Sequence, residues 1–167
     1  IQVGIEFSMC SSDLEEKYNL AIFQDFEEAL AQKPQVVFVC NPTSLHVPVA
    51  IRAAREGCAL FIEKPLSHNL EHVDELINLV ESQDLAAAVG YQMRFHPCLQ
   101  RLYALVQEKK VGRILSVRAE VGEYLPGWHT YEDYRQSYAS RQDLGGGVIL
   151  SQIHELDYLY WLFGMPR

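Results

Sequence analysis

The sequence predicts an α/β fold: a truncated, doubly wound Rossmann-type parallel sheet, followed by the start of an α+β domain with an antiparallel sheet. Short apolar segments alternate with helical segments through the first half of the chain, which is the order of a parallel sheet with helical crossovers. Residues 35–40 include five consecutive apolar side chains, which is typical of a parallel strand covered on both faces. Residues 114–124 alternate apolar with polar side chains, which indicates a strand with one solvated face.

Capping and turn residues delimit the elements of the first domain, which we place at residues 1–92. Asp25 opens a helix in a capping box and Pro34 ends it, while Gly57 closes a later helix that has Pro48 in its first turn. We expect strands at about 1–7, 35–40, 59–63 and 86–90. We expect helices at about 12–19, 25–33, 45–57 and 70–83.

Residues 93–167 are expected to begin a second domain, for substrate binding and oligomerisation. Its predicted elements are a helix at about 98–109, the strand at 114–124 and a helix at about 148–163. The last helix carries an apolar stripe of the kind that faces a core. The stripe consists of Ile149, Ile153, Leu156, Tyr160 and Phe163.

The composition excludes several classes of partner. The chain has 167 residues and a formal net charge of −8, which argues against nucleic acid or an anionic membrane surface, because both attract basic patches. No apolar run approaches the roughly 20 residues that span a bilayer. The four cysteines are far apart with no CxxC pair, so we expect a reducing, cytoplasmic location.

Ligands of open parallel sheets bind at the carboxyl ends of the strands, which directs attention to residues 41–46 and 63–65. Lys64 is able to exchange a proton with a substrate hydroxyl, and Glu63 is able to hold a ribose diol. A solvated strand end is the alternative interpretation of both residues. Adjacent strand residues point to opposite faces, so the two share a site only if Pro65 bends the chain.

Four motifs in this order resemble the Gfo/Idh/MocA family, which takes its name from glucose-fructose oxidoreductase, inositol dehydrogenase and rhizopine catabolism. They are Asn41-Pro42 followed by His46, then Glu63-Lys64-Pro65, Arg94-Phe95-His96-Pro97, and Gly145-Gly146-Gly147 followed by His154 and Asp157. The resemblance runs from about residue 3 to the end of the chain. It implies a dehydrogenase that uses NAD or NADP on a carbohydrate substrate and that forms a homo-oligomer when complete.

The resemblance also implies roles for individual residues. Lys64 and His154 would be catalytic, with His154 as the general base that meets the sugar hydroxyl. The other implied ligands are Asn41, Pro42, His46 and Glu63 for the cofactor, and Arg94 and Asp157 for the substrate. Without the resemblance, a histidine such as His154 on an apolar helix is more often a hydrogen-bonded core residue.

Two further patterns have alternative interpretations. His68 and His72 have the spacing of metal ligands on a helix, but no third ligand is evident, so we interpret them as part of a solvated turn. Residues 145–147 have the composition of a phosphate-binding turn, but no strand precedes them, so a flexible turn is the better interpretation.

Two features depart from the family pattern. Leu150 stands where the family commonly has an aspartate four residues before the motif histidine, which weakens the case for an aspartate-assisted proton relay. The chain also has no G-x-G-x-x-G, whose glycines let a pyrophosphate approach a helix amino terminus. We therefore expect the first strand-helix unit to precede Ile1. Glu6 would then be the acid that binds the cofactor ribose, or else an exposed strand-end acid.

The segment 123–147 is long, aromatic and sparingly apolar, and long loops beside a site often bind ligands. Trp128 offers a stacking surface, and Arg135 offers a guanidinium group suited to a carboxylate or a phosphate. We interpret the segment as part of a site for a sugar with an anionic substituent, such as a nucleotide-linked sugar. The alternative is a loop packed by its own tyrosines.

The sequence thus predicts an oxidoreductase that moves a hydride between a nicotinamide cofactor and a hydroxyl or carbonyl carbon of a sugar, nucleotide-sugar or cyclitol. The alternative is a non-catalytic relative, or an inactive fragment, that binds a sugar or a partner subunit without a cofactor. The missing glycines and Leu150 favour this alternative, whereas the intact Glu63-Lys64-Pro65 opposes it.

Overall fold

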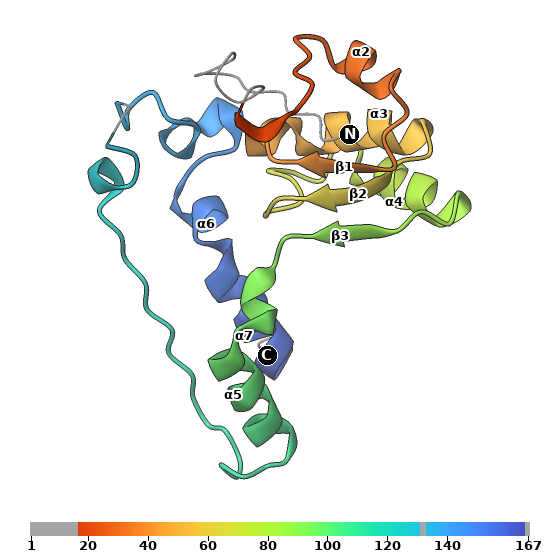
Figure 1. Ribbon diagram of the computed structural model, residues 1–167. Helices are drawn as coiled ribbons and strands as arrows, with labels where there is room; N and C mark the ends of the chain where they lie inside the picture. The colour runs from red at the N-terminus through yellow and green to blue at the C-terminus, as the bar shows by residue number, and fades with distance from the viewer. Residues whose placement is uncertain (1–16, 131–132, 166–167) are drawn as a thin grey trace. The chain divides into compact units, whose positions relative to one another are not determined.

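The computed structural model describes residues 17–130 and 133–165, and these residues form two compact units (Figure 1). The first unit contains residues 17–90 and the short segment 143–145, and the second contains the other described residues. The predicted first strand and Glu6 lie outside the described residues, as does most of the first predicted helix.

Three parallel strands form the centre of the first unit. They are β1 (Val36–Val39), β2 (Ala59–Ile62) and β3 (Ala87–Val89), in the order β1-β2-β3. The helices α3 (His46–Arg55) and α4 (Val73–Ser82) connect them as crossovers (Figure 1). This arrangement confirms the predicted Rossmann-like α/β sheet for the described part of the chain.

The predicted capping residues occupy the expected positions. Asp25 caps the short helix α2 (Phe26–Leu30), where its carboxylate accepts hydrogen bonds of 2.8 and 3.0 Å from the amides of Glu27 and Glu28. Pro48 lies in the first turn of α3, and Gly57 follows that helix with φ of +77°, a conformation that favours glycine.

The hydrophobic core of the first unit lies on one face of the sheet. Val39, Leu60 and Ile62 point toward α3 and α4, which contribute buried residues such as Ala50 and Leu76. On the other face, Val36 and Phe38 are 44% and 63% exposed. We expected helices on both faces, but within the described residues both crossovers cover the same face, as successive right-handed crossovers to neighbouring strands do.

The second unit consists of helices and irregular segments. Its α-helices are α5 (Pro97–Gln107), α6 (Val148–Ser151) and α7 (Ile153–Phe163). Short 3-10 helices occur at Gln92–Phe95, Leu125–Gly127 and Tyr138–Ser140. Tyr103 of α5 stacks on Trp161 of α7, with ring centroids 4.4 Å apart and an interplanar angle of 5°.

The strand predicted at 114–124 does not form in the described part of the chain. Its alternation is present in the sequence, but no described residue forms a ladder with it, and its apolar side chains are exposed, including Leu115 at 82%. Because a strand is stabilised only when its backbone groups are paired, alternation without a partner leaves an extended segment. The expected antiparallel sheet is therefore not seen among the described residues.

The helix predicted at 148–163 is interrupted, and it packs through a different face from the one expected. Gln152, with φ of −100° and ψ of 33°, separates α6 from α7. Ile149 and Leu156 of the predicted apolar stripe are 67% and 52% exposed. The contacts of α7 instead involve Asp157, which pairs with Arg94, and Trp161, which stacks on Tyr103. None of the described helices is both long and apolar enough to cross a membrane.

Candidate functional site

Backbone hydrogen bonds connect the carboxyl ends of the three neighbouring strands. The amide of Glu63 donates to the carbonyl of Val39 at 2.8 Å, and the amide of Gly90 donates to the carbonyl of Ile62 at 2.8 Å. Glu63 and Gly90, the first residues after β2 and β3, therefore stay in register with the ends of the neighbouring strands. This is the edge at which open parallel sheets bind ligands.

His46 contacts both of the loops that follow β1 and β2. It is the first residue of α3 and is only 1% exposed. Its Nδ1 lies 2.8 Å from the carbonyl oxygen of Pro65, and its Nε2 lies 2.8 Å from that of Asn41. The imidazole thus links the two loops through backbone groups, and its burial leaves almost no surface for a ligand.

Asn41 follows β1 and presents a buried side-chain oxygen. Its Oδ1 accepts no hydrogen bond from the described residues. A buried acceptor without a donor is costly, so this atom is suited to a ligand that brings an N–H or O–H group. Pro42 is half-buried beside it, and its carbonyl accepts a 2.8 Å hydrogen bond from the amide of Leu45.

Glu63 and Lys64 follow β2 and are both half-buried. The Oε2 atom of Glu63 accepts a hydrogen bond of 3.1 Å from the amide of Lys64, and the Lys64–Pro65 peptide bond is cis. The carboxylate also lies against the end of β3, where a Cβ atom placed on Gly90 would be 3.3 Å from Oε1. Burial, followed by the charge of Glu63, raises the pKa of the Cys40 thiol.

The second unit holds Arg94 and Asp157 in a two-point ion pair. Arg94 donates from Nε to Oδ2 at 2.9 Å and from Nη2 to Oδ1 at 2.5 Å. The Asp157 side chain is 7% exposed and that of Arg94 is 38% exposed. This hydrogen bonding raises the pKa of the Arg94 guanidinium. Both carboxylate oxygens of Asp157 are therefore engaged by the protein itself.

His154 lies one helical turn before Asp157 on α7, and its ring meets that of Tyr91. The two ring centroids are 6.3 Å apart with an interplanar angle of 81°, an edge-to-face arrangement. The guanidinium carbon of Arg94 lies 6.0 Å from the centre of the same Tyr91 ring. Burial, followed by the charge of Asp157, raises the pKa of the Tyr91 phenol. Tyr91 was not among the predicted site residues.

The two predicted residues of the long loop, Trp128 and Arg135, have different surroundings from His154, Tyr91 and Arg94. Trp128 is half-buried, and its indole N–H has no acceptor among the described residues. Arg135 is exposed, and its guanidinium carbon lies 5.4 Å from the ring centre of its neighbour Tyr134. The Arg135 guanidinium thus makes a cation–π contact with the ring of Tyr134.

Two glycines of the triglycine segment are required by close packing. Gly145 has φ of +79°, and a Cβ atom there would lie 2.8 Å from the Cβ of Thr43 and 3.0 Å from the amide nitrogen of Ser44. A Cβ atom on Gly146 would fall on the carbonyl oxygen of Tyr138. Protein atoms therefore fill the space beside both residues, as in a packed turn.

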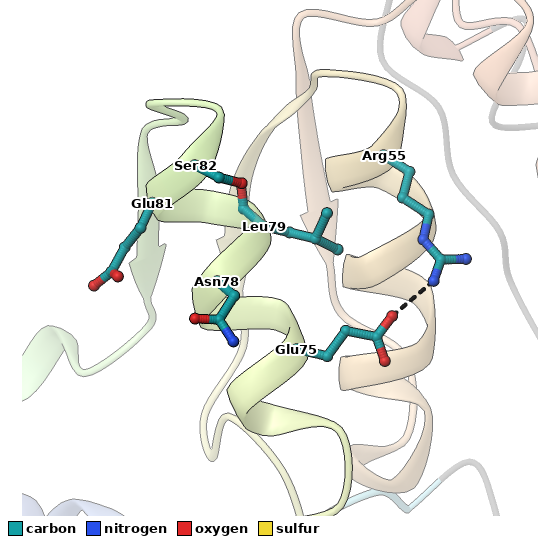
Figure 2. Close-up of a pocket in the computed structure, with 6 residues that line it drawn as sticks. All are labelled: Arg55, Glu75, Asn78, Leu79, Glu81 and Ser82. Carbon is teal, nitrogen blue, oxygen red and sulfur yellow. Dashed lines mark hydrogen bonds and ion pairs between the residues drawn. The ribbon is translucent and has the colours of Figure 1, made fainter.

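The described residues contain no group of three His, Cys, Asp or Glu side chains placed to hold a metal ion. His72 instead lies 3.2 Å from the carboxylate of Glu75. A surface depression lies between α3 and α4, where Arg55 and Glu75 pair at 2.7 Å (Figure 2). Arg55 is the last residue of α3 and His46 the first, so this depression is at the opposite end of the helix from the strand-end loops.

The sequence profiles of two protein domains match the chain. Residues 8–91 match a profile described as "Oxidoreductase family, NAD-binding Rossmann fold", and residues 99–167 match the "GFO/IDH/MocA C-terminal domain". A curated relative, the D-xylose dehydrogenase of Paenarthrobacter nicotinovorans, is 29% identical over 149 residues, which are 88% of this chain and 38% of that protein.

Solved structures with the same fold include two dehydrogenases. The myo-inositol 2-dehydrogenase of Lactobacillus plantarum superposes with a TM-score of 0.81 at 18% identity, covering 98% of this chain and 48% of that one. The WlbA dehydrogenase of Bordetella pertussis, in complex with NADH and UDP-GlcNAcA, gives 0.73 at 22% identity, covering 91% and 44%. The chain thus spans less than half the length of each of these proteins.

Proposed function

Because the chain belongs to the Gfo/Idh/MocA oxidoreductase family and carries its NAD-binding Rossmann domain, we propose that it transfers a hydride between a nicotinamide cofactor and a carbohydrate. The substrate carbon would be a hydroxyl or carbonyl carbon of a sugar, nucleotide-sugar or cyclitol. One observation carries the proposal: Asn41, Glu63 and Lys64 follow adjacent parallel strands, at the edge where such sheets bind ligands.

The strand-end loops fit the nicotinamide end of a dinucleotide. The buried Oδ1 of Asn41 needs a donor, and a carboxamide or a ribose hydroxyl would supply one. Glu63, held by the Lys64 amide, would accept hydrogen bonds from a ribose diol. The nicotinamide ring, when bound, supplies the carbon that gives or takes the hydride. NAD and NADP are both compatible with these residues.

Lys64 and His154 would manage the proton of the substrate hydroxyl. Lys64 follows β2 at the ligand-binding edge, where its ammonium group would donate to the substrate oxygen or accept from it. His154 lies on α7 with its ring fixed edge-to-face on Tyr91, which limits its orientations. Arg94 would act by holding Asp157, and Trp128 and Arg135 would contact an anionic substituent of the sugar.

Substitution of Lys64 tests the proposed reaction. A Lys64→Met variant should lose about 10²–10⁴-fold in kcat, since a positioned acid or base contributes that much, while quenching of tryptophan emission by NADH persists. Lys110→Met is the matched control, because Lys110 is exposed and lies after α5 in the second unit. Unchanged turnover in Lys64→Met, measured against a panel of sugars and cyclitols, would contradict the proposed role.

A second candidate is a non-catalytic relative that binds a sugar or a partner subunit. It is favoured by Leu150, which stands where the family commonly has an aspartate. NADH titration separates the two candidates. Saturable quenching with micromolar affinity supports the enzyme, whereas sugar binding without any NADH binding supports the relative.

The finer features of the whole protein are also proposals. The exposed apolar residues of 114–124 support pairing of this segment with further strands in an antiparallel sheet. Such a sheet would offer a surface for a homo-oligomer. The described cysteines Cys40, Cys58 and Cys98 are all free thiols, which supports a reducing, cytoplasmic location.

A further inference from the structure

The buried imidazole of His46 connects the two loops that hold the proposed site residues. One loop begins with Asn41 after β1, and the other runs from Glu63 to Pro65 after β2. The ring nitrogens reach the carbonyl oxygens of Asn41 and Pro65, at 2.8 Å each. Side chains that hydrogen-bond two main-chain groups from different loops restrict how far those loops move apart.

The direction of these hydrogen bonds is fixed by chemistry. Carbonyl oxygens only accept, so the ring must donate: a neutral imidazole donates to one of them, and a protonated imidazole donates to both. The residue is only 1% exposed, so the ring is almost closed to bulk solvent. A ring placed in this way is poorly suited to contact a cofactor and well suited to hold the backbone.

We propose that His46 is a positioning residue of the site: it sets the spacing between the loop that carries Asn41 and the loop that carries Lys64. This inference rests on the proposed function, because Asn41 and Lys64 are its cofactor and proton-transfer residues. With an N–H group on each ring nitrogen, Nδ1 would fix the Lys64 side through Pro65, and Nε2 would fix the cofactor side through Asn41. We call these two hydrogen bonds, from Nδ1 to Pro65 and from Nε2 to Asn41, the two arms of the His46 brace. Different substitutions of His46 can remove one arm and keep the other.

The packing around His46 is consistent with a fixed turn. Thr43, three residues earlier, is 3% exposed, and Gly145 lies against both Thr43 and Ser44. The turn between β1 and α3 is therefore held by the imidazole on one side and by the 143–145 segment on the other. A small displacement there would be passed directly to Asn41, because the turn follows it in the chain.

Two amide substitutions separate the arms. An asparagine amide nitrogen occupies nearly the place of Nδ1, and a glutamine amide nitrogen nearly the place of Nε2. His46→Asn should therefore keep the Pro65 bond and most of kcat, while the Kd for NADH rises about tenfold. His46→Gln should keep the NADH affinity, while kcat falls about 100-fold as Lys64 is displaced.

His46→Ala should lose both properties, and Val47→Ala is its control. Val47 is the next residue of α3 and is 2% exposed, so its truncation loosens the same core without touching either carbonyl. Val47→Ala should leave the Kd and kcat within about threefold of the unmodified protein at temperatures well below unfolding. In a Lys64→Met background, His46→Gln should cause no further loss of kcat, because it acts through Lys64.

Amide hydrogen exchange makes the test independent of turnover. Residues 41–45 and 63–67 should exchange faster in His46→Ala than in Val47→Ala. Equal exchange in the two variants would overturn the brace, as would a parallel loss of NADH affinity and kcat in His46→Asn and His46→Gln. Faster exchange together with full activity in Lys64→Met would leave the brace standing and refute the proposed reaction.

Discussion

In the first unit, the residues proposed for the site lie between Asn41 and Lys64 and follow neighbouring strands. In the second unit, by contrast, Arg94 and Asp157 are 63 positions apart in the sequence. The first group is aligned by the parallel ladder, which continues through the Glu63 and Gly90 amides. The second group comes from a 3-10 turn and a helix, and one ion pair joins them. Main-chain bonds order one group, and side-chain bonds order the other.

This difference predicts different sensitivities to substitution. A ladder made of backbone groups survives most side-chain changes, so the first unit should be sensitive mainly where packing leaves no room or where a buried side chain holds the backbone. An ion pair with a 7% exposed carboxylate is different, because removal of its partner leaves a buried charge.

The largest effect is expected from the Arg94–Asp157 pair. Arg94→Ala should lower the free energy of unfolding of the second unit by about 3 kcal/mol, because the Asp157 carboxylate loses both donors while still buried. Urea unfolding followed by tryptophan emission reports this directly, since Trp128 and Trp161 both lie in the second unit.

Two further variants make this measurement specific. Arg118→Ala removes the ion pair between Arg118 and Glu120 in the same unit, where the two side chains are 82% and 75% exposed. This variant should change the free energy of unfolding by less than about 0.5 kcal/mol. The double variant Arg94→Met with Asp157→Leu should recover at least half of the loss, because no buried charge remains. If Arg94→Ala is as stable as Arg118→Ala, side-chain pairing does not order the second unit.

A smaller effect is expected at Gly145, where the first unit has no room for a side chain. Gly145→Ala should cost about 2 kcal/mol, of which about half is the left-handed backbone and the rest the contact with Thr43 and Ser44. Gly57→Ala is the control, because its φ of +77° is nearly the same and nothing lies within 4 Å of an added Cβ atom. Amide exchange at residues 43–45 should rise only in Gly145→Ala, and a rise in both would show that backbone conformation alone matters.

The elements of the first unit could be predicted because local residues mark their ends. Asp25 caps α2 and Gly57 follows α3, and these signals depend on backbone conformation a few residues away. The strand at 114–124 could not be predicted with the same certainty, since alternation defines a wet and a dry face but not a partner. Predicting a sheet requires both strands of each pair.

The contacts of the site were harder to predict than its location. The motifs pointed to the strand ends, but the partners of His46 are main-chain carbonyls, which have no sequence signature. The apolar stripe of the last helix suggested a packing face that included Leu156, whereas the ion pair and the Tyr103–Trp161 stack select another face. Polar pairing between distant segments leaves no periodic pattern to detect.

The smallest predicted effect tests the placement of Glu63 against Cys40, within the strand-end group. Burial and the Glu63 charge both raise the pKa of the Cys40 thiol, so less thiolate is present at a given pH than for an ordinary cysteine. Glu63→Gln removes only the charge, the smaller cause, so the pKa should fall partway toward its ordinary value. Alkylation of Cys40 near neutral pH should then be faster, because more of the thiol is ionised. Peptide mass spectrometry measures the alkylation rate of Cys40, with Cys98 of the second unit as the control whose rate should not change. If the Cys40 rate is the same before and after the substitution, the Glu63 carboxylate does not lie near the end of β1.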